Sequence, residues 1–234
     1  MSVGSRSLEN RTFPLIFAAP SGAGKTTIAQ RLMERRGDVV FSISMTTRTP
    51  RSYEHNGVHY HFVEEDEFRR LADAGELVEW AEVHGNLYGT PARNLTEAIE
   101  RRQYLILDID IQGARQIRRA VPEAVSIFVL PPSGVELGQR LAGRGSEDGA
   151  VRRRRLDNAR AEIQAAGEFD YVIVNGSLDT SVAAVEAILL TEGCRTSRLP
   201  GLKQEIGRLD DEIGQCLRGI GSPPSSSSDP QRGT

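Results

Sequence analysis

The feature that most constrains this chain is a glycine-rich run, Ala19-Pro20-Ser21-Gly22-Ala23-Gly24-Lys25-Thr26. An apolar stretch, Leu15–Ala18, precedes the run and an amphipathic stretch follows it. Strand, glycine turn and helix start form the local structure of a phosphate-binding P-loop, in which backbone N–H groups and a helix N-terminus surround an anion. In such a loop Lys25 reaches the β- and γ-phosphates and the Thr26 hydroxyl contacts Mg²⁺. Ala19 stands where the general pattern has glycine.

Lys25 is one of two lysines in a chain whose Lys and Arg together number 29; the other is Lys203. A lysine kept where almost every other basic residue is arginine favours a need for a compact ammonium group over a planar guanidinium fork. The alternative is a solvated lysine at a helix end inside a chance glycine turn.

The composition of the 234 residues, with 38% hydrophobic and 26% charged, is typical of a soluble globular protein of one or two domains. The net charge of −3 gives no overall attraction to nucleic acid. No apolar run has transmembrane length, and the polar start of the chain lacks a signal-peptide core. Cys194 and Cys216 suggest neither a disulfide framework nor a zinc site, so we expect a cytoplasmic protein.

Apolar stretches alternate with helical patterns, which predicts a parallel sheet flanked by helices. The predicted strands are Leu15–Ala18, Val39–Ser44, Tyr104–Asp108, Val125–Leu130 and Tyr171–Val174. The predicted helices are Thr26–Arg36, Ile111–Arg119, Val135–Leu141, Val151–Ala166 and Asp179–Leu190. Shorter segments between Met45 and Arg102 predict an α+β insertion made of Val58–Val63, Glu64–Ala74, Leu77–Val83 and Asn86–Tyr88.

The C-terminal region contains an apolar stripe with alternating spacings of four and three. Its members are Leu202, Ile206, Leu209, Ile213, Cys216 and Ile220. The stripe predicts a helix that packs on its own domain or contacts another subunit. Residues 1–12 and the Ser- and Pro-rich residues 221–234 are expected to be disordered.

A second anion site is predicted after the second strand, at Ser44, Arg48 and Arg51, because two nearby arginines can hold a phosphate. In an arginine-rich chain these residues can also form a solvated loop. Within the insertion, Glu79 can accept from two adjacent donors, as the N1–H and amino group of guanine require, while Ser44 or Thr90 donates to O6. Glu79 can equally point outward from a strand.

Two carboxylates, Asp108 and Asp110, end the apolar stretch that begins at Leu105. P-loop enzymes place such a carboxylate beside Mg²⁺ or its waters, although Asp110 can instead cap the next helix. Farther on, Arg140 and Arg144 flank a glycine-containing loop that precedes the run Arg152–Arg155. A helix–loop–helix of this kind can close over a nucleotide and neutralise the transferring charge.

Together these motifs resemble the bacterial type of guanylate kinase, from about residue 14 to about residue 192. Besides the loop, the matching segments are Thr46-Thr47-Arg48-x-Pro50-Arg51, Asn56-Gly57-x-x-Tyr60, Gly85-Asn86-x-Tyr88-Gly89-Thr90, Leu107-Asp108-Ile109-Asp110-x-Gln112-Gly113 and Arg140-Leu141-x-Gly143-Arg144-Gly145. Bacterial members commonly carry alanine where Ala19 stands. The chain departs from the family at Thr27, at Leu87 and after Asn175, where an acid is replaced by Gly176.

The resemblance implies the α/β fold of a P-loop nucleoside monophosphate kinase. Its parts would be a core of residues 13–44 and 103–194, a GMP-binding segment of residues 45–102, a mobile helical lid at about residues 141–155 and a C-terminal helix within residues 195–220. The implied reaction is transfer of the ATP γ-phosphoryl group to GMP or dGMP, with Mg²⁺, in purine nucleotide metabolism.

The resemblance also implies roles for individual residues. The ATP-binding positions would be Ala19, Pro20, Ser21, Gly22, Ala23, Gly24, Lys25, Thr26 and Asn175. The GMP-binding positions would be Ser44, Arg48, Arg51, Tyr60, Glu79, Tyr88, Thr90 and Asp110. The catalytic positions would be Lys25, Asp108, Arg140, Arg144 and Arg155, with Thr26 at the metal.

Two other functions stay open at this point. One is a guanylate-kinase-like binding module that has lost catalysis, although such modules usually lose charges that this chain keeps at Lys25, Asp108 and Arg144. The other is a kinase for a different acceptor, such as a phosphorylated ribose, which has no use for Glu79 and Thr90 together. We expect no nucleic-acid or membrane partner, and a structural or solvated role for the four histidines, His55, His59, His61 and His84.

Overall fold

The computed structural model describes residues 8–83, 85–142 and 149–220. The chain divides into two compact units, one of Arg11–Gly193 and one that joins Met1–Asn10 to Cys194–Thr234. Among the described residues, no helix is both long enough and apolar enough to cross a membrane.

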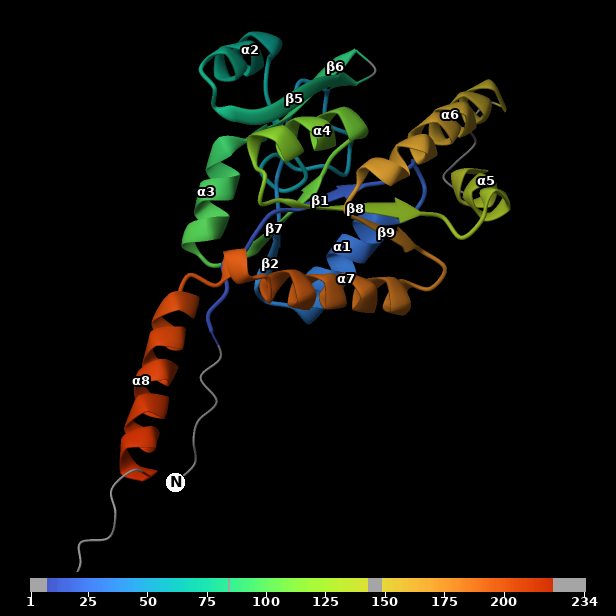
Figure 1. The fold of residues 1–234 in the computed structure, drawn as a ribbon. Coiled ribbons are helices and arrows are strands. Elements are labelled where there is room, and N and C mark those ends of the chain that lie inside the picture. Colours follow the sequence, from blue (N-terminus) through green and yellow to red (C-terminus); the bar gives the residue numbers. More distant parts are fainter. Residues whose placement is uncertain (1–7, 84, 143–148, 221–234) are drawn as a thin grey trace, which may run out of the picture. The chain divides into compact units, whose positions relative to one another are not determined.

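The unit Arg11–Gly193 contains a parallel five-stranded sheet with the strand order β2-β7-β1-β8-β9 (Figure 1). Its strands are β1 (Leu15–Ala18), β2 (Val39–Phe41), β7 (Tyr104–Asp108), β8 (Val125–Leu130) and β9 (Tyr171–Val174). Strands this apolar suit a parallel sheet that is covered on both faces. The register pairs Phe17 of β1 with Asp108 of β7, so the carboxylate lies beside the strand that leads into the glycine-rich loop.

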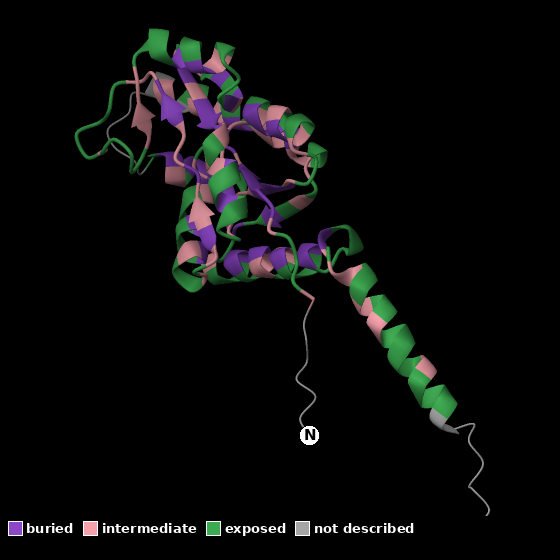
Figure 2. Cartoon of the chain, turned by 90° about the vertical axis from the view of Figure 1, so that its left-hand side faces the viewer, coloured by how far each residue is buried: buried purple, intermediate pink, exposed green. Residues whose placement is uncertain are grey.

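Helices cover both faces of this sheet. Neighbouring side chains of a strand point to opposite faces, and the apolar strands therefore need a hydrophobic partner on each face. Leu15 and Phe17 belong to the core formed with α1 (Lys25–Arg35) and α7 (Leu178–Gly193). Ile16 belongs to a second core, with α3 (Ala92–Glu100) and α4 (Ile111–Ala120). Figure 2 shows the buried positions concentrated in the strands and on the sides of the helices that face them.

A second sheet has the order β4-β3-β6-β5 and lies in the inserted part of the same unit. Its strands are β3 (Met45–Thr46), β4 (His61–Phe62), β5 (Leu77–Val83) and β6 (Asn86–Pro91). The helix α2 (Glu65–Asp73) packs on it through Phe68 and Leu71, which join a separate hydrophobic core. β5 is an edge strand of this sheet.

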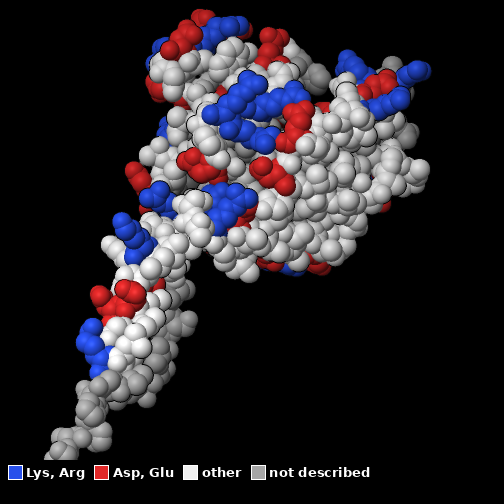
Figure 3. All heavy atoms as spheres, in the orientation of Figure 1, with Lys and Arg blue, Asp and Glu red and all other residues white. Residues whose placement is uncertain are grey.

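The remaining described helices of the larger unit are α5 (Gly134–Ala142), α6 (Gly149–Glu162) and the 3₁₀ segment η1 (Ile163–Glu168). α5 and α6 share a small core that includes Leu137, Leu141 and Ala159. On the face drawn in Figure 3, basic and acidic side chains lie close to one another in several places. Ion pairs of the larger unit include Arg69–Glu65 on α2 and Arg115–Glu168 between α4 and η1.

The smaller unit contains η2 (Thr196–Arg198) and α8 (Leu202–Ile220). α8 confirms the predicted C-terminal helix. Four of its apolar side chains are exposed: Ile206, Leu209, Ile213 and Leu217. The predicted tail, residues 221–234, and residues 1–7 lie outside the described residues.

The bounds of β1, β7, β8 and β9 match the predicted strands, whereas two predicted strands in and near the insertion were too long. The second strand ends at Phe41, although the Ser42 N–H still donates to the Ile106 carbonyl of β7 at 2.9 Å. After Phe41, the Asn94 amide donates to Ser42 Oγ at 2.9 Å and to the Ile43 carbonyl at 3.1 Å. Only His61–Phe62 of the predicted strand Val58–Val63 forms β4, which pairs with the two residues of β3, and Tyr60 makes an isolated bridge to Asn56. The helix α3 was not predicted at all.

Candidate active site

The glycine-rich loop joins β1 to α1 and has the backbone geometry that only glycine adopts easily. Gly22 has φ of +89° and Gly24, the N-cap of α1, has φ of +97°. The Asn175 amide, from the end of β9, supports the loop by donating to the Ala23 carbonyl at 2.8 Å, and it accepts from Ser181 at 3.1 Å. A Cβ atom on Gly24 would lie 2.3 Å from the Asn175 nitrogen. The loop is therefore closely packed against β9.

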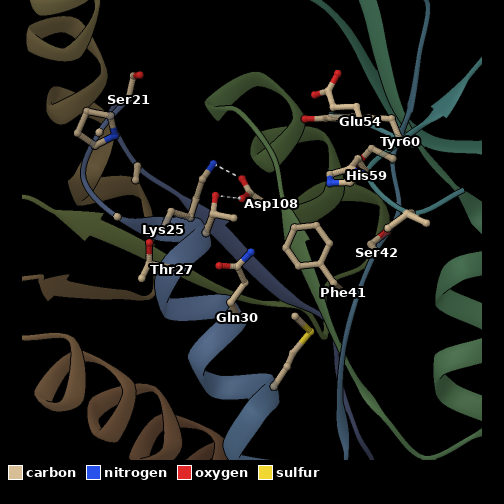
Figure 4. Close-up of a pocket in the computed structure, with 18 residues that line it drawn as sticks. Ser21, Lys25, Thr27, Gln30, Phe41, Ser42, Glu54, His59, Tyr60 and Asp108 are labelled. Carbon is tan, nitrogen blue, oxygen red and sulfur yellow. Dashed lines mark hydrogen bonds and ion pairs between the residues drawn. The ribbon is translucent and has the colours of Figure 1, made fainter. Parts of the chain in front are cut away.

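Asp108 joins the two polar side chains that begin α1. Its carboxylate forms an ion pair with Lys25 through one oxygen and accepts from the Thr26 hydroxyl at 3.1 Å through the other (Figure 4). The Lys25 ammonium also donates to the Ile109 carbonyl at 3.2 Å. The predicted trio of lysine, hydroxyl and carboxylate is thus brought together at the ends of β1 and β7.

A cavity of about 560 Å³ extends from this trio toward the second sheet. The loop and α1 form one wall, and Ser44, Glu54, His59 and Tyr60 form part of the other. In Figure 4 the Lys25–Asp108 pair lies between Ser21 of the loop and the labelled Glu54 and Tyr60. The cavity therefore connects the phosphate-binding loop with residues of the predicted second anion site.

Arg48 is held in place by several neighbours at that second site. Its guanidinium pairs with Glu54 at 2.8 Å, donates to the Tyr88 hydroxyl at 3.1 Å and lies over the Tyr60 ring, 5.5 Å from the ring centroid. The hydrogen bond from Arg48 lowers the pKa of Glu54 below its ordinary value, and Glu54 raises the pKa of Arg48 in turn. Burial raises the pKa of the Tyr60 hydroxyl. Tyr60 and Tyr88 therefore both contact Arg48 at the predicted phosphate position.

Arg51 lies beside the same carboxylate. Its backbone N–H donates to Glu54 at 2.7 Å, and its side chain donates to the Tyr53 hydroxyl at 2.9 Å. Glu54, whose side chain is 5% exposed, lines the cavity and was not among the site residues that the sequence analysis named. Its role depends on a turn that brings it back to Arg48, which the local pattern of residues does not reveal.

Glu79 and Thr90 face each other across β5 and β6 and are both buried. The Thr90 hydroxyl donates to the Glu79 carboxylate at 2.7 Å. Burial is the main cause that raises the pKa of Glu79 to about 7, and the negative charge of Asp110 adds to it. Glu79 thus points inward, and the alternative that it faces solvent from the strand was wrong.

Asp110 caps α4, as the sequence analysis allowed, because one of its oxygens accepts from the Gly113 N–H at 2.7 Å. A Cβ atom at Gly113 would lie 2.7 Å from Glu79 Oε2 and 3.4 Å from Asp110 Oδ1. The two carboxylates therefore converge on the first turn of α4, as a site that reads hydrogen-bond donors on a base requires.

The arginines of the predicted lid approach the other side of the loop. Arg140 of α5 donates to the Ala23 carbonyl at 3.2 Å and to the Asn175 carbonyl at 3.3 Å, and it pairs with Glu136. Arg155 of α6 donates to the Ser21 hydroxyl at 2.9 Å. Arg144 lies outside the described residues.

A parallel sheet of this order, with a glycine-rich loop before α1, a strand-end carboxylate beside it and a smaller inserted sheet, defines the P-loop nucleoside monophosphate kinase fold. The family model for guanylate kinase matches residues 11–192. The chain therefore belongs to the guanylate kinase family, as its motifs predicted, and is an ATP:GMP phosphotransferase.

Individual relatives agree with this assignment. A guanylate kinase of Syntrophotalea carbinolica is 48% identical over 196 residues, which cover 84% of this chain and 92% of that protein. One from Geobacter sulfurreducens is 46% identical, with 83% and 96% covered. The crystal structure of guanylate kinase from Anaplasma phagocytophilum superposes with a TM-score of 0.70 at 36% identity, covering 84% of this chain and 94% of the other. An inactive binding module is accordingly not favoured.

Proposed function

We propose that the chain performs the kinase reaction by holding ATP at the glycine-rich loop and GMP at the second sheet, on either side of one cavity. The observation that carries this proposal is the shared lining of that cavity by Lys25, Asp108, Ser44 and Tyr60. In-line phosphoryl transfer needs positioning and charge stabilisation more than covalent help. A cavity that joins the two anion sites meets that need.

On the ATP side, residues 19–26 surround the phosphates with backbone N–H groups, and Lys25 contacts the β- and γ-phosphates. The first residues of α1 add the favourable field of a helix N-terminus. Arg140, Arg144 and Arg155 neutralise charge that develops during transfer. Asn175 contributes by keeping the loop in shape, since its amide is already bonded to Ala23 and Ser181.

The residues present fit a Mg²⁺ ion. Mg²⁺ prefers oxygen ligands and usually takes one or two from protein beside phosphates and water. The Thr26 hydroxyl and the Asp108 carboxylate are adjacent at the edge of the cavity, so Thr26 would hold the ion, with Asp108 beside it. When bound, the ion would supply charge neutralisation for the phosphates.

On the GMP side, Arg48, Arg51, Tyr60 and Tyr88 hold the phosphate. Guanine is read by a second set of groups: Glu79 accepts from N1–H and the amino group, Thr90 and Ser44 contribute hydroxyls, and Asp110 faces the same edge. Selectivity follows because a base with a different donor pattern leaves the buried Glu79 carboxylate without the donors that guanine supplies, while the Thr90 hydroxyl remains bonded to it. The GMP phosphate is itself the nucleophile, so no separate base is required.

We propose the same division of the chain as the motifs implied. The core comprises residues 13–44 and 103–194, the GMP-binding segment comprises residues 45–102, and the lid spans about residues 141–155. The separate hydrophobic core of the second sheet supports movement of the segment as a body. Closure would exclude water that could otherwise hydrolyse ATP.

Two further proposals concern the whole protein. The exposed apolar side chains of α8 support a homo-oligomer that forms through this helix. A cytoplasmic location is supported by Cys194 and Cys216, which are free and exposed thiols.

The experiment that tests the proposed site is a coupled assay of ADP formation from Mg-ATP, with GMP, dGMP, AMP, CMP and UMP as separate acceptors. We expect rapid turnover with GMP, slower turnover with dGMP and almost none with the others. Glu79→Gln should lower kcat/KM for GMP by about 10- to 100-fold with little change in the KM for ATP. Equal use of AMP and GMP, or unchanged GMP kinetics in the variant, would contradict the assignment.

A further inference from the structure

Gln116 of α4 closes the free edge of β5. β5 is an edge strand of the second sheet, so one side of its backbone has no strand partner among the residues that the structure describes. The Gln116 amide donates to the Trp80 carbonyl at 2.8 Å and accepts from the Trp80 N–H at 3.3 Å. A primary amide that bonds both backbone groups of one residue takes the place of a neighbouring strand.

This double hydrogen bond lies next to the carboxylate that faces guanine in the proposed site. Trp80 follows Glu79 directly in β5, and Gly113 precedes Gln116 by three residues, about one turn of α4. Glu79 Oε2 reaches so near to Gly113 that a Cβ atom there would lie 2.7 Å away. One helix face therefore fixes the strand through Gln116 and leaves room for the carboxylate at Gly113.

The contact lies where β5 joins two hydrophobic cores. Leu77 of β5 belongs to the core of the second sheet, while Val78 packs against the core around Ile16 and Leu107, to which α4 also belongs. Asp110, at the start of α4, and Glu79, in β5, must converge on the same edge of a base. Their separation depends on how β5 lies against α4, and the Gln116 amide fixes the backbone of β5 there beside the packing of Val78.

We propose that Gln116 is a positioning residue for guanine: it holds β5 so that the Glu79 carboxylate meets both the N1–H and the amino group of the base. This inference rests on the proposed role of Glu79. A shift of β5 would lengthen one of the two hydrogen bonds from the base to Glu79. The resulting loss of affinity would be largest for a base that offers both donors. Gln116 thus acts on selectivity between GMP and IMP, which lacks the amino group.

The test compares Gln116→Leu with the wild-type enzyme in steady-state assays with GMP and with IMP. We expect the KM for GMP to rise by about tenfold and the preference for GMP over IMP to fall by a similar factor, with the KM for ATP unchanged. Gly113→Ala, which forces the Glu79 carboxylate to move, should show the same signature. Gln164→Leu, the same substitution at an exposed glutamine of η1, is the control and should behave as wild type.

Two further variants keep the outcome interpretable. Gln116→Glu loses the donor to the Trp80 carbonyl and should change the KM for GMP and the preference for GMP over IMP in the same direction as Gln116→Leu. It serves as the test if the leucine variant fails to fold. Glu79→Gln is measured in parallel. If Glu79→Gln raises the KM for GMP while both Gln116 variants retain wild-type GMP and IMP kinetics, the positioning role is overturned and the guanine site stands. If Glu79→Gln has no effect, the proposed guanine site itself is wrong.

Discussion

The pKa of Glu79 links substrate binding to pH at the scale of a single residue. The carboxylate is 5% exposed and its pKa is raised to about 7, mainly by burial. Only the ionised form can accept from both the N1–H and the amino group of guanine. Below pH 7 the protonated form dominates, so binding of GMP should weaken as the pH falls.

We therefore expect kcat/KM for GMP to rise as the pH increases from 6 to 8, at saturating ATP. The GMP phosphate also titrates near pH 6, so the raw profile contains two contributions. Glu79→Gln retains the phosphate contribution and removes that of the side chain. The ratio of the two profiles should increase with pH through about 7, and a flat ratio would show that Glu79 does not titrate in the free enzyme.

Lys25 gives a second prediction at this scale. Its ammonium lies between the Asp108 carboxylate and the Ile109 carbonyl, where there is space for a compact charge. Both Lys25→Met and Lys25→Arg should lower kcat by about 100-fold or more, because the first removes the charge and the second cannot fit it. Calorimetric titration with GMP should show unchanged affinity in both variants. An active Lys25→Arg enzyme would count against a requirement for the smaller group.

The glycine-rich loop provides the prediction at the scale of an element. Gly24→Ala would force a left-handed backbone on alanine and place Cβ 2.3 Å from the Asn175 amide. The amide would then leave Ala23, and both ATP binding and stability would suffer. We expect a higher KM for ATP and a loss of about 1–3 kcal/mol in the free energy of unfolding.

Gly37→Ala is the matched control for that variant. Gly37 follows α1, and an added Cβ would meet nothing within 4 Å. Thermal melts with and without ATP should separate the two variants. Similar melting temperatures and similar ATP kinetics would show that the contact between Gly24 and Asn175 is not a constraint.

Elements show clearly what the sequence could predict and what it could not. β7 and β8 were predicted with correct bounds, because continuous apolar runs between turn residues suffice to mark buried strands. α3 was missed, since Leu95 and Ala98 are its buried residues and two positions are too few to mark a helical period in the sequence. Its Asn94 side chain bonds to Ser42, 52 residues away in the chain, and such a long-range contact leaves no local pattern.

The candidate site also contains residues that could be placed from the sequence and residues that could not. Lys25, Thr26 and Asp108 could be placed from motifs, because a P-loop and a strand-end carboxylate have fixed local contexts. Glu54 and Gln116 could not, since their partners Arg48 and Trp80 are met only after the chain has folded. Neither residue type is unusual in its sequence surroundings.

At the scale of the whole molecule, the exposed apolar side chains of α8 predict association. Ile213 is 58% exposed and Leu217 is 64% exposed on one helix. Ile213→Glu should reduce the oligomeric mass measured by size-exclusion chromatography with light scattering, because a buried charge without a partner opposes assembly. Gln215→Glu adds the same charge to an exposed polar position and should leave the mass unchanged. A monomeric wild-type protein at all concentrations would contradict the proposal.

The pairing of Arg48 with Glu54 has a consequence for the crowded anion environment of a cell. At the proposed phosphate position, a carboxylate already touches the Arg48 side chain and the Arg51 backbone. Inorganic phosphate or sulfate would have to compete with Glu54 through the arginines alone, whereas GMP would also bind through its base. The internal carboxylate is therefore expected to weaken the binding of small abundant anions and to favour an anion attached to guanine.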